Sequence, residues 1–285
     1  MAGCGFVGLQ AARRLHAKGL RVTGLTHSQA SASALAGEPF PVVACDIADR
    51  AALAALAQEN GGFPAVLDAV SSGRGGADAY RRAYLEGARS LLETLRPQRF
   101  LFTSSTSVYA QTGGEPVDEQ SPAEPQRETG RILRETEELV LSHGGQVARL
   151  GGIYAPERWV LWRKFCSGEA VIEGDGSRYL NQIHRDDAAA ALVFLLAEVS
   201  EPGLFNVTDG TWPTLREVYE AFARATNRPL PPYGPVNPDR KRGWTHKRVL
   251  TTRLQQLGWQ PEYRGVTKAI AAVRALVRQE KRAQF

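Results

Sequence analysis

A glycine-rich loop at the start of the chain constrains the fold more than any other feature. Residues 3–8 read Gly-Cys-Gly-Phe-Val-Gly, and an amphipathic stretch ending at Gly19 follows them. In a strand–loop–helix unit, glycines at this spacing permit a tight turn, a close approach of the backbone to a pyrophosphate and packing of the helix. The pattern therefore predicts that a dinucleotide is held by Gly3, Gly5, Phe6, Val7 and Gly8.

The strand that should precede this loop is missing, since only Met1 and Ala2 stand before it. In a doubly wound sheet the first strand is central, so its loss would leave two neighbouring strands with unpaired backbone groups. The sequence therefore predicts that Met1 is an internal methionine and that codons for an apolar strand lie upstream. Reading the DNA before Met1 tests this, because an in-frame stop codon directly upstream would exclude it.

Strand-like and helix-like segments alternate over the first half of the chain. Apolar runs at 65–70 and 99–105 are typical of buried strands, and amphipathic stretches at 77–95 and 128–143 are typical of helices. Continuous apolar strands that alternate with helices form parallel sheets covered on both faces. We therefore expect an α/β fold with a doubly wound, Rossmann-type parallel sheet whose first strand is missing.

Beyond residue 150 the alternation loosens, and a proline-rich segment at 227–238 must be irregular. We expect residues 1–150 to form an NAD(P)-binding domain and residues 151–285 to form a smaller, irregular substrate-binding lobe. The segment of about residues 182–207 should return to the first domain.

Composition limits location and partners. The three cysteines are widely spaced and form neither a disulfide framework nor a metal cluster, which favours a reducing cytoplasm. No apolar run is long enough to span a bilayer, and the first residues do not resemble an export signal. The basic runs at 239–248 and 278–282 read as solvated faces, so nucleic acid is an unlikely partner. We expect a cytoplasmic protein without a metal.

The end of the second expected strand bears on the choice of cofactor. An acidic residue about 20 residues after the glycine loop would bind the ribose 2′-OH of NAD, but Thr26, His27 and Ser28 stand there. Because no carboxylate repels a 2′-phosphate, the sequence favours NADP over NAD. The alternative is that His27 is an exposed turn residue.

Motifs in order along almost the whole chain resemble the extended short-chain dehydrogenase/reductases, the NAD-dependent epimerase/dehydratase group. The matching stretches are CDIAD at 45–49, FTSSTSVYA at 102–110, RLGGIYAP at 149–156, NQIHRDDAAAA at 181–191, LFNVTDG at 204–210 and LTTRLQQLGWQPEY at 250–263. The resemblance implies that Asp46 binds the adenine edge, that Ile47 flanks the ring, and that Ala69 and Tyr154 complete the cofactor site. It places Ser105 where the family has its catalytic Ser or Thr.

One departure affects the chemistry. The family's catalytic Tyr-x-x-x-Lys falls on Thr129 and Leu133, and an asparagine of the family falls on Tyr84. A threonine hydroxyl is too weak an acid to replace a tuned phenol, and leucine provides neither charge nor hydrogen bond. This pattern is similar to the atypical branch of the superfamily, which keeps cofactor binding without the usual catalytic pair.

Other side chains are candidates for the missing chemistry, each with core or surface packing as its alternative. Tyr84, Tyr109, Tyr154 and Glu128 are candidate proton carriers. By the resemblance, Tyr84, Arg163, Arg178 and Asn181 would bind substrate, and His184 would tie a helix start to a loop.

The sequence therefore predicts an NAD(P)-binding oxidoreductase or epimerase-like protein with a non-standard acid/base. Its substrate would be small and polar or anionic, sugar nucleotides included. The alternative is a non-catalytic NAD(P)-binding redox sensor or scaffold, and a nucleic-acid-associated protein is the third hypothesis. The resemblance also implies a homodimer through helices 77–95 and 128–143.

Overall fold

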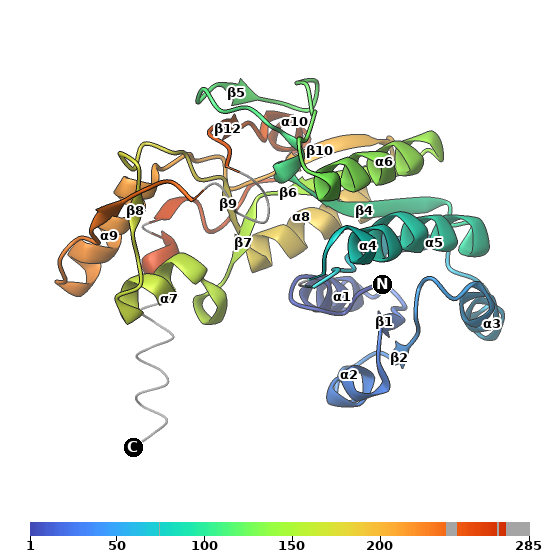
Figure 1. Cartoon of the computed structure of the whole chain (residues 1–285). Coiled ribbons are helices and arrows are strands. Elements are labelled where there is room, and N and C mark those ends of the chain that lie inside the picture. Colours follow the sequence, from blue (N-terminus) through green and yellow to red (C-terminus); the bar gives the residue numbers. More distant parts are fainter. Residues whose placement is uncertain (74, 238–243, 267, 272–285) are drawn as a thin grey trace, which may run out of the picture.

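The computed structural model describes residues 1–73, 75–237, 244–266 and 268–271 (Figure 1). Of the two basic runs singled out above, only 244–248 lies among the described residues, and 278–282 lies outside them. In the described part of the chain, no helix combines the length and the apolar character that crossing a bilayer requires.

A parallel sheet runs through the centre of the molecule. Hydrogen bonds join its larger part in the order β10 (Gly203–Val207), β6 (Gln146–Leu150), β4 (Arg99–Ser105) and β3 (Ala65–Asp68). A second part pairs β1 (Gly24–Thr26) with β2 (Val42–Ala44). This arrangement confirms the predicted α/β doubly wound parallel sheet.

Ala2 joins the two parts of the sheet where the missing first strand was expected. It makes one parallel bridge to Leu25 on β1 and one to Asp68 on β3. Its amide donates to the Leu67 carbonyl, and its carbonyl accepts from the Ala69 amide, both at 2.9 Å. Its two neighbours make the hydrogen bonds to β1: the Met1 carbonyl accepts from the Leu25 amide at 2.8 Å, and the Gly3 amide donates to the Leu25 carbonyl at 3.0 Å. The upstream coding sequence stays a prediction.

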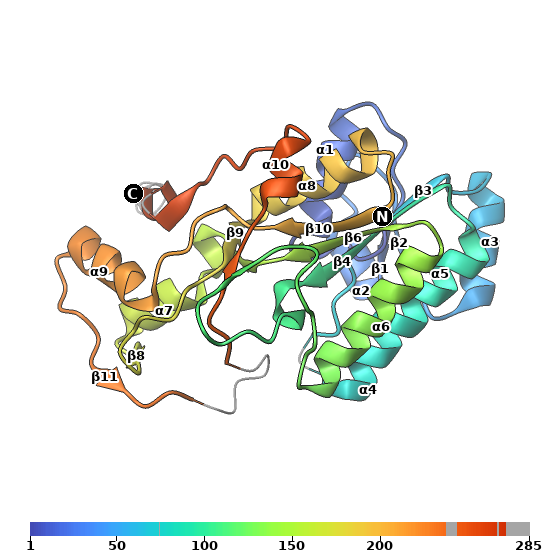
Figure 2. The same ribbon diagram turned by 90° about the horizontal axis from the view of Figure 1, so that it is seen from above.

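Helices cover both faces of this sheet (Figure 2). On one face lie α1 (Gly8–Ala17) and α8 (Arg185–Glu198), and on the other α3 (Arg50–Asn60), α5 (Gly87–Leu95) and α6 (Glu128–Ser142). Alternate strand residues feed the two cores: Leu67 and Leu101 pack on one side, and Val66 and Phe100 on the other.

The stretch expected as one helix over 77–95 has three parts. These are α4 (Ala77–Tyr80), a π-helical segment η1 (Arg81–Glu86) and α5. A Cβ at Gly87 would lie 2.5 Å from the Ile47 side chain, so glycine allows the helix to approach that loop closely. Pi-helical turns are frequent at functional sites, and this one borders the cavity described below. The homodimer through this stretch and α6 stays a prediction.

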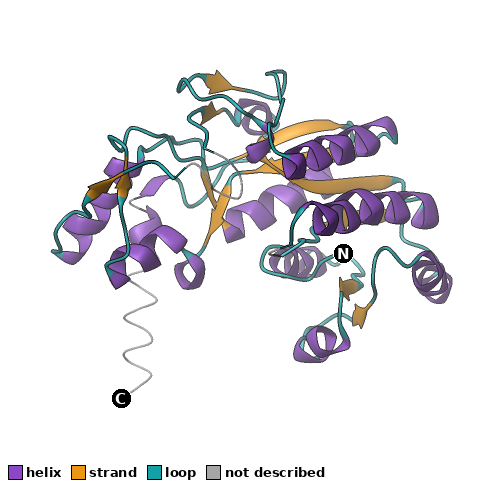
Figure 3. Ribbon diagram, viewed as in Figure 1, coloured by secondary structure: helices purple, strands orange, loops and turns teal. Residues whose placement is uncertain are grey.

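The second half of the chain builds a lobe beside the sheet (Figure 1) and then returns to it. An apolar cluster that includes Tyr154, Trp159 and Phe222 forms the core of the lobe, and loops make up much of it (Figure 3). The chain returns to the central sheet at α8 and β10. The remaining elements are α2 (Gln29–Ala34), η2 (Thr106–Val108), β5 (Pro116–Val117), β7 (Gly152–Tyr154), η3 (Pro156–Arg158), α7 (Val160–Ser167), β8 (Ile172–Glu173), β9 (Gln182–His184), α9 (Leu215–Thr226), β11 (Tyr233–Gly234), β12 (Arg248–Val249) and α10 (Thr252–Gln256).

Candidate functional site

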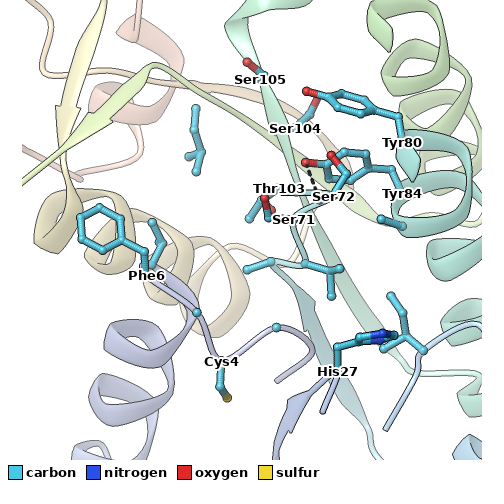
Figure 4. A pocket seen from close by; sticks show the side chains of 18 of the residues that line it. Cys4, Phe6, His27, Ser71, Ser72, Tyr80, Tyr84, Thr103, Ser104 and Ser105 are labelled. Carbon is cyan, nitrogen blue, oxygen red and sulfur yellow. Dashed lines mark hydrogen bonds between the residues drawn. The ribbon is translucent and has the colours of Figure 1, made fainter. Parts of the chain in front are cut away.

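A cavity of about 880 Å³ opens where the strands of the central sheet end (Figure 4). Carboxyl ends of parallel strands are the usual ligand-binding edge of such sheets. The volume lies within the range of roughly 300–1,000 Å³ that is typical of small-molecule sites. Its lining includes these residues predicted to bind a cofactor: Gly3, Gly5, Phe6, Val7, Thr26, His27, Asp46, Ile47 and Ala69.

Each of the three glycines of the loop serves a different structural purpose. Gly3 has a φ of +83°, and a Cβ there would lie 2.7 Å from the Ala69 carbonyl; a Cβ at Gly8 would lie 2.1 Å from the Gly3 oxygen. At Gly5, a Cβ would have none of the described atoms within 4 Å. The fold therefore requires Gly3 and Gly8, whereas Gly5 keeps the cavity open. Gly8 lies behind the lining and serves the packing of α1.

The start of α1 is suited to an anion. Its N-cap is Val7, and no side chain among the described residues caps the helix. The first amides of a helix have no partner within it and carry a partial positive charge, so they bind phosphate groups well. A further cation is close, because the guanidinium of Arg158 lies 4.7 Å from the centre of the Phe6 ring and lines the same cavity.

The opposite wall, beyond β1 and β2, carries one carboxylate and a neighbouring cation. Asp46 accepts a hydrogen bond from Arg82 at 2.6 Å. Burial opposes ionisation of Asp46, but the Ala48 amide and the Arg82 guanidinium outweigh it and lower the pKa of the carboxyl. His27 and Ser31 line the cavity beside this pair. Ser28 instead caps α2 by accepting from the Ser31 amide, and it lies outside the lining.

Ser105 lies at the end of β4 and lines the cavity. Its hydroxyl oxygen accepts from the Ser107 amide at 3.2 Å and so caps η2. Tyr84 also lines the cavity, and its hydroxyl accepts from the Ser72 amide at 3.5 Å. This end of the cavity, where Ser105 and Tyr84 lie, therefore presents hydroxyl groups, and we call it the hydroxyl end.

Thr129 and Leu133, the positions of the family's catalytic pair, project from α6 toward this end. Leu133 is buried and lines the main cavity. Thr129 lines a smaller cavity of about 180 Å³ next to it. Since neither side chain is charged or strongly acidic, any proton donor at this end must come from another element.

A buried ion pair supports this end from behind. Glu137 on α6 is fully buried and accepts from Arg149 at 2.9 Å and 2.6 Å. The same carboxylate accepts from Ser104 at 2.5 Å and from Arg134 at the surface. The two hydrogen bonds from Arg149 and the one from Ser104 connect α6, β6 and β4. This buried ion pair therefore holds in place the elements that form the hydroxyl end of the cavity.

Two tyrosines predicted for the site lie outside the cavity lining. The Tyr109 hydroxyl is 2.7 Å from the Asp118 carbonyl and 2.9 Å from Oδ1 of Asn206, and burial raises its pKa. Tyr154 is 2% exposed and stacks on Trp159 at 4.6 Å. Burial raises the pKa of Tyr154 as well. Both phenols lie in packed surroundings.

The other predicted residues lie in the lobe or at a helix end. Asn181 bridges two backbone groups by donating to the Lys247 carbonyl and accepting from the Val249 amide. Arg163 is exposed on α7, and Arg178 is half-buried; neither lines the main cavity. His184 caps α8 by accepting from the Asp186 amide at 3.2 Å, which confirms its predicted structural role. Glu128 is exposed at the start of α6.

Sequence reasoning missed Tyr80, Arg82 and Arg158, which all line the cavity. Tyr80 precedes Tyr84 by about one turn of the same helical stretch, so a cavity-facing Tyr84 could have pointed to it. Arg158 follows the predicted segment at 149–156, but its approach to Phe6 is a long-range contact. Among the described residues, no group of three or more His, Cys, Asp or Glu could hold a metal ion.

Parallel strands, a glycine loop and a cavity at their carboxyl ends define a doubly wound dinucleotide-binding protein. The model of the NAD dependent epimerase/dehydratase family matches residues 2–150, and the chain belongs to this family. The resemblance inferred from the sequence motifs is thereby confirmed.

Several known proteins are similar to this one over most of the chain. Protein YeeZ of Escherichia coli strain K12 is 29% identical over 238 residues, which is 79% of this chain and 82% of YeeZ. A structure from Methylobacillus flagellatus, whose name places it among the NAD-dependent epimerases/dehydratases, has a TM-score of 0.79 at 27% identity and covers 97% of both chains. The dTDP-glucose 4,6-dehydratase of Bacillus anthracis in complex with NAD has a TM-score of 0.81 over 98% of this chain and 96% of its own. At 16% identity, that likeness shows the fold alone.

Proposed function

We propose that this protein is an NADP-dependent oxidoreductase or epimerase-type enzyme that acts on a small polar substrate. The observation that carries the proposal is a single cavity with a glycine loop on one side and the Ser105 hydroxyl on another. One wall suits a pyrophosphate, and another presents groups that can bind a substrate oxygen. Proximity of a bound cofactor and a bound substrate is the main requirement for transfer between them.

Different residues of the chain would bind the different parts of the dinucleotide. The amides at the start of α1 and the Arg158 guanidinium would bind the pyrophosphate. Asp46 and Ile47 would contact the adenine end, and Ala69 would lie beneath the middle of the molecule. When bound, the nicotinamide ring supplies or accepts a hydride at the Ser105 end of the cavity.

Two observations support NADP over NAD. Among the described residues that line the cavity near the end of β1, the side chains are Thr26, His27 and Ser31, which do not repel a 2′-phosphate. Asp46 is the carboxylate among the described residues that line the cavity, and it accepts a hydrogen bond from Arg82 at 2.6 Å. The Arg82 guanidinium and the His27 imidazole would both be hydrogen-bond donors to a phosphorylated ribose.

Titration with NADPH and NADH, followed by the nucleotide's own fluorescence, tests the proposal. We expect NADPH to bind at least about tenfold more tightly, which corresponds to roughly 1.4 kcal/mol. Incubation of the complex with small aldehydes, ketones and sugar nucleotides then tests for oxidation of NADPH. Failure of both nucleotides to bind would refute the proposal. Tight binding without turnover of any compound would favour the alternative of a non-catalytic redox sensor or scaffold.

A further inference from the structure

Tyr80, at the end of α4, stands on the wall between two cavities. The main cavity and the smaller cavity of about 180 Å³ share the residues Tyr80, Ser107 and Leu133 in their linings. Tyr80 is 6% exposed, so it is buried within this wall. Any reaction between a ligand in one cavity and a ligand in the other would take place beside it.

Most residues that line the smaller cavity are uncharged. Its lining offers the hydroxyls of Tyr80, Ser107, Thr129 and Thr245 and the indole of Trp244, with Arg127 as the charged member among the described lining residues. An apolar cavity of about 150 Å³ can hold a benzene molecule, so this space fits a six-membered ring or a short chain. The chemistry of the lining favours a ligand with carbonyl or hydroxyl groups.

Tyr80 is the phenol that reaches the junction. In Figure 4 its ring extends from α4 toward the end of β4, where Ser104 and Ser105 lie. Tyr84 packs against it with ring centres 5.0 Å apart, but the Tyr84 hydroxyl lies toward Ser72 instead. Thr129 lines the smaller cavity only, and an aliphatic hydroxyl is a far weaker acid than a phenol.

We propose that Tyr80 is the proton-transfer residue of this site and that the reacting end of a small, uncharged carbonyl or alcohol compound occupies the smaller cavity. This proposal rests on the function proposed above. In a reduction, bound reduced nicotinamide would supply the hydride to the substrate carbon, and the Tyr80 Oη–H bond would break so that its proton passes to the substrate oxygen. The electron pair of that bond stays on Oη, which regains a proton from water. Ser105 would hold the substrate oxygen during the transfer.

Tyrosine ionisation, followed by ultraviolet absorbance during a pH titration, tests the proposal without a known substrate. The oxidised nicotinamide ring is positively charged and the reduced ring is neutral. An opposite charge within about 4–6 Å lowers the pKa of an acid by roughly 1–3 units. We therefore expect one phenol to ionise at least about one pH unit lower with bound NADP⁺ than with bound NADPH. This shifted transition should disappear in Tyr80→Phe and persist in the matched control Tyr84→Phe.

Charged and titratable groups near Tyr80 include Tyr84 on η1, Arg127 in the lining of the smaller cavity, and the Arg81–Glu135 pair between η1 and α6. The comparison of NADP⁺ with NADPH changes the charge of the nicotinamide ring and none of these side chains. If Tyr80→Phe fails to fold, 3-fluorotyrosine at position 80 assigns the transition in a folded protein, because fluorine moves that transition alone to lower pH.

Three results would overturn the assignment of Tyr80: persistence of the shifted transition in Tyr80→Phe, its loss in Tyr84→Phe alone, or its absence at saturating NADP⁺. Each of these requires that the dinucleotide binds. Absence of dinucleotide binding is a separate result, which refutes the proposed function itself.

Discussion

The glycine-loop side and the hydroxyl end of the cavity are built in different ways. The loop side consists of backbone: Gly3 and Gly8 allow the chain to pass close to itself, and no side chain among the described residues caps the start of α1. The hydroxyl end consists of side chains, and a buried Glu137–Arg149 pair supports it. A backbone site can be recognised from spacing alone, whereas a side-chain site depends on contacts between distant segments.

The largest expected effect tests whether the hydroxyl end depends on its buried charge. Glu137→Gln keeps the shape of the side chain but leaves Arg149 buried without its counter-ion. We expect the free energy of unfolding to fall by about 3–5 kcal/mol in urea denaturation. Glu138→Gln is the matched control, since that side chain is 68% exposed and pairs with Arg134 at the surface, where a loss of at most about 1 kcal/mol is expected. Equal effects of the two variants would contradict the comparison.

The next effect concerns a buried carboxyl behind the glycine loop. Asp68 is 1% exposed and accepts from the Val70 amide, and burial raises its pKa to about 7. Between about pH 4 and pH 7 the unfolded chain loses this proton while the folded chain keeps it. The Asp68 carboxyl therefore lowers stability as pH rises, by up to about 1.4 kcal/mol per pH unit. Asp68→Asn should remove this slope when unfolding is measured at pH 5 and pH 7; parallel slopes in both proteins would contradict the assignment.

Gly5→Val tests the loop side without disturbing the fold. A side chain at Gly5 has room among the described atoms, but it would occupy part of the cavity where we propose that the pyrophosphate binds. We expect NADPH to bind about a hundredfold more weakly, or about 2.7 kcal/mol, with no change in Tm. Gly37→Ala is the control, because its Cβ also meets none of the described atoms within 4 Å and position 37 lies outside the cavity lining. Unchanged NADPH affinity in Gly5→Val would place the pyrophosphate elsewhere.

The smallest effect concerns the choice of cofactor. His27 is exposed and lines the cavity, so His27→Asp introduces a carboxylate near the proposed site of the 2′-phosphate at little cost to folding. We expect affinity for NADPH to fall about tenfold while affinity for NADH is kept or increased. His27→Asn separates loss of the imidazole from gain of the charge. A parallel loss of both nucleotides in His27→Asp would show that this position does not select the cofactor.

The sequence was sufficient for the sheet and for the glycine loop, because both depend on local patterns. Alternating apolar runs and helices indicated the parallel sheet, and the spacing of Gly3, Gly5 and Gly8 indicated the loop. The bridging of two strands by Ala2 was not expected, because a single residue carries no strand pattern. The predicted sites at Gly5, His27 and Asp46 stay predictions that the experiments above address.

The hydroxyl end was harder to predict, because its residues come from separate elements. Thr129 and Leu133 were noted as departures from the family, but their position does not show what replaces them. Tyr80 reaches the junction from a neighbouring helix that contains a π-helical segment. Neither the packing of α4 against α6 nor a π-helical turn has a clear sequence signal. The Tyr109 and Tyr154 phenols, which matched family motifs, lie in packed surroundings instead.

The positions of the tryptophans allow an unfolding experiment to test whether the second half of the chain and the central sheet unfold together. The five tryptophans are Trp159, Trp162, Trp212, Trp244 and Trp259. Tryptophan emission therefore reports on the second half alone, whereas far-ultraviolet circular dichroism reports on both halves. The elements α8 and β10 belong to the second half of the chain but complete the central sheet. Unfolding of the second half would therefore leave β6 without its partner strand β10. The two optical signals should then change together in denaturant, as one cooperative unit without a separable lobe.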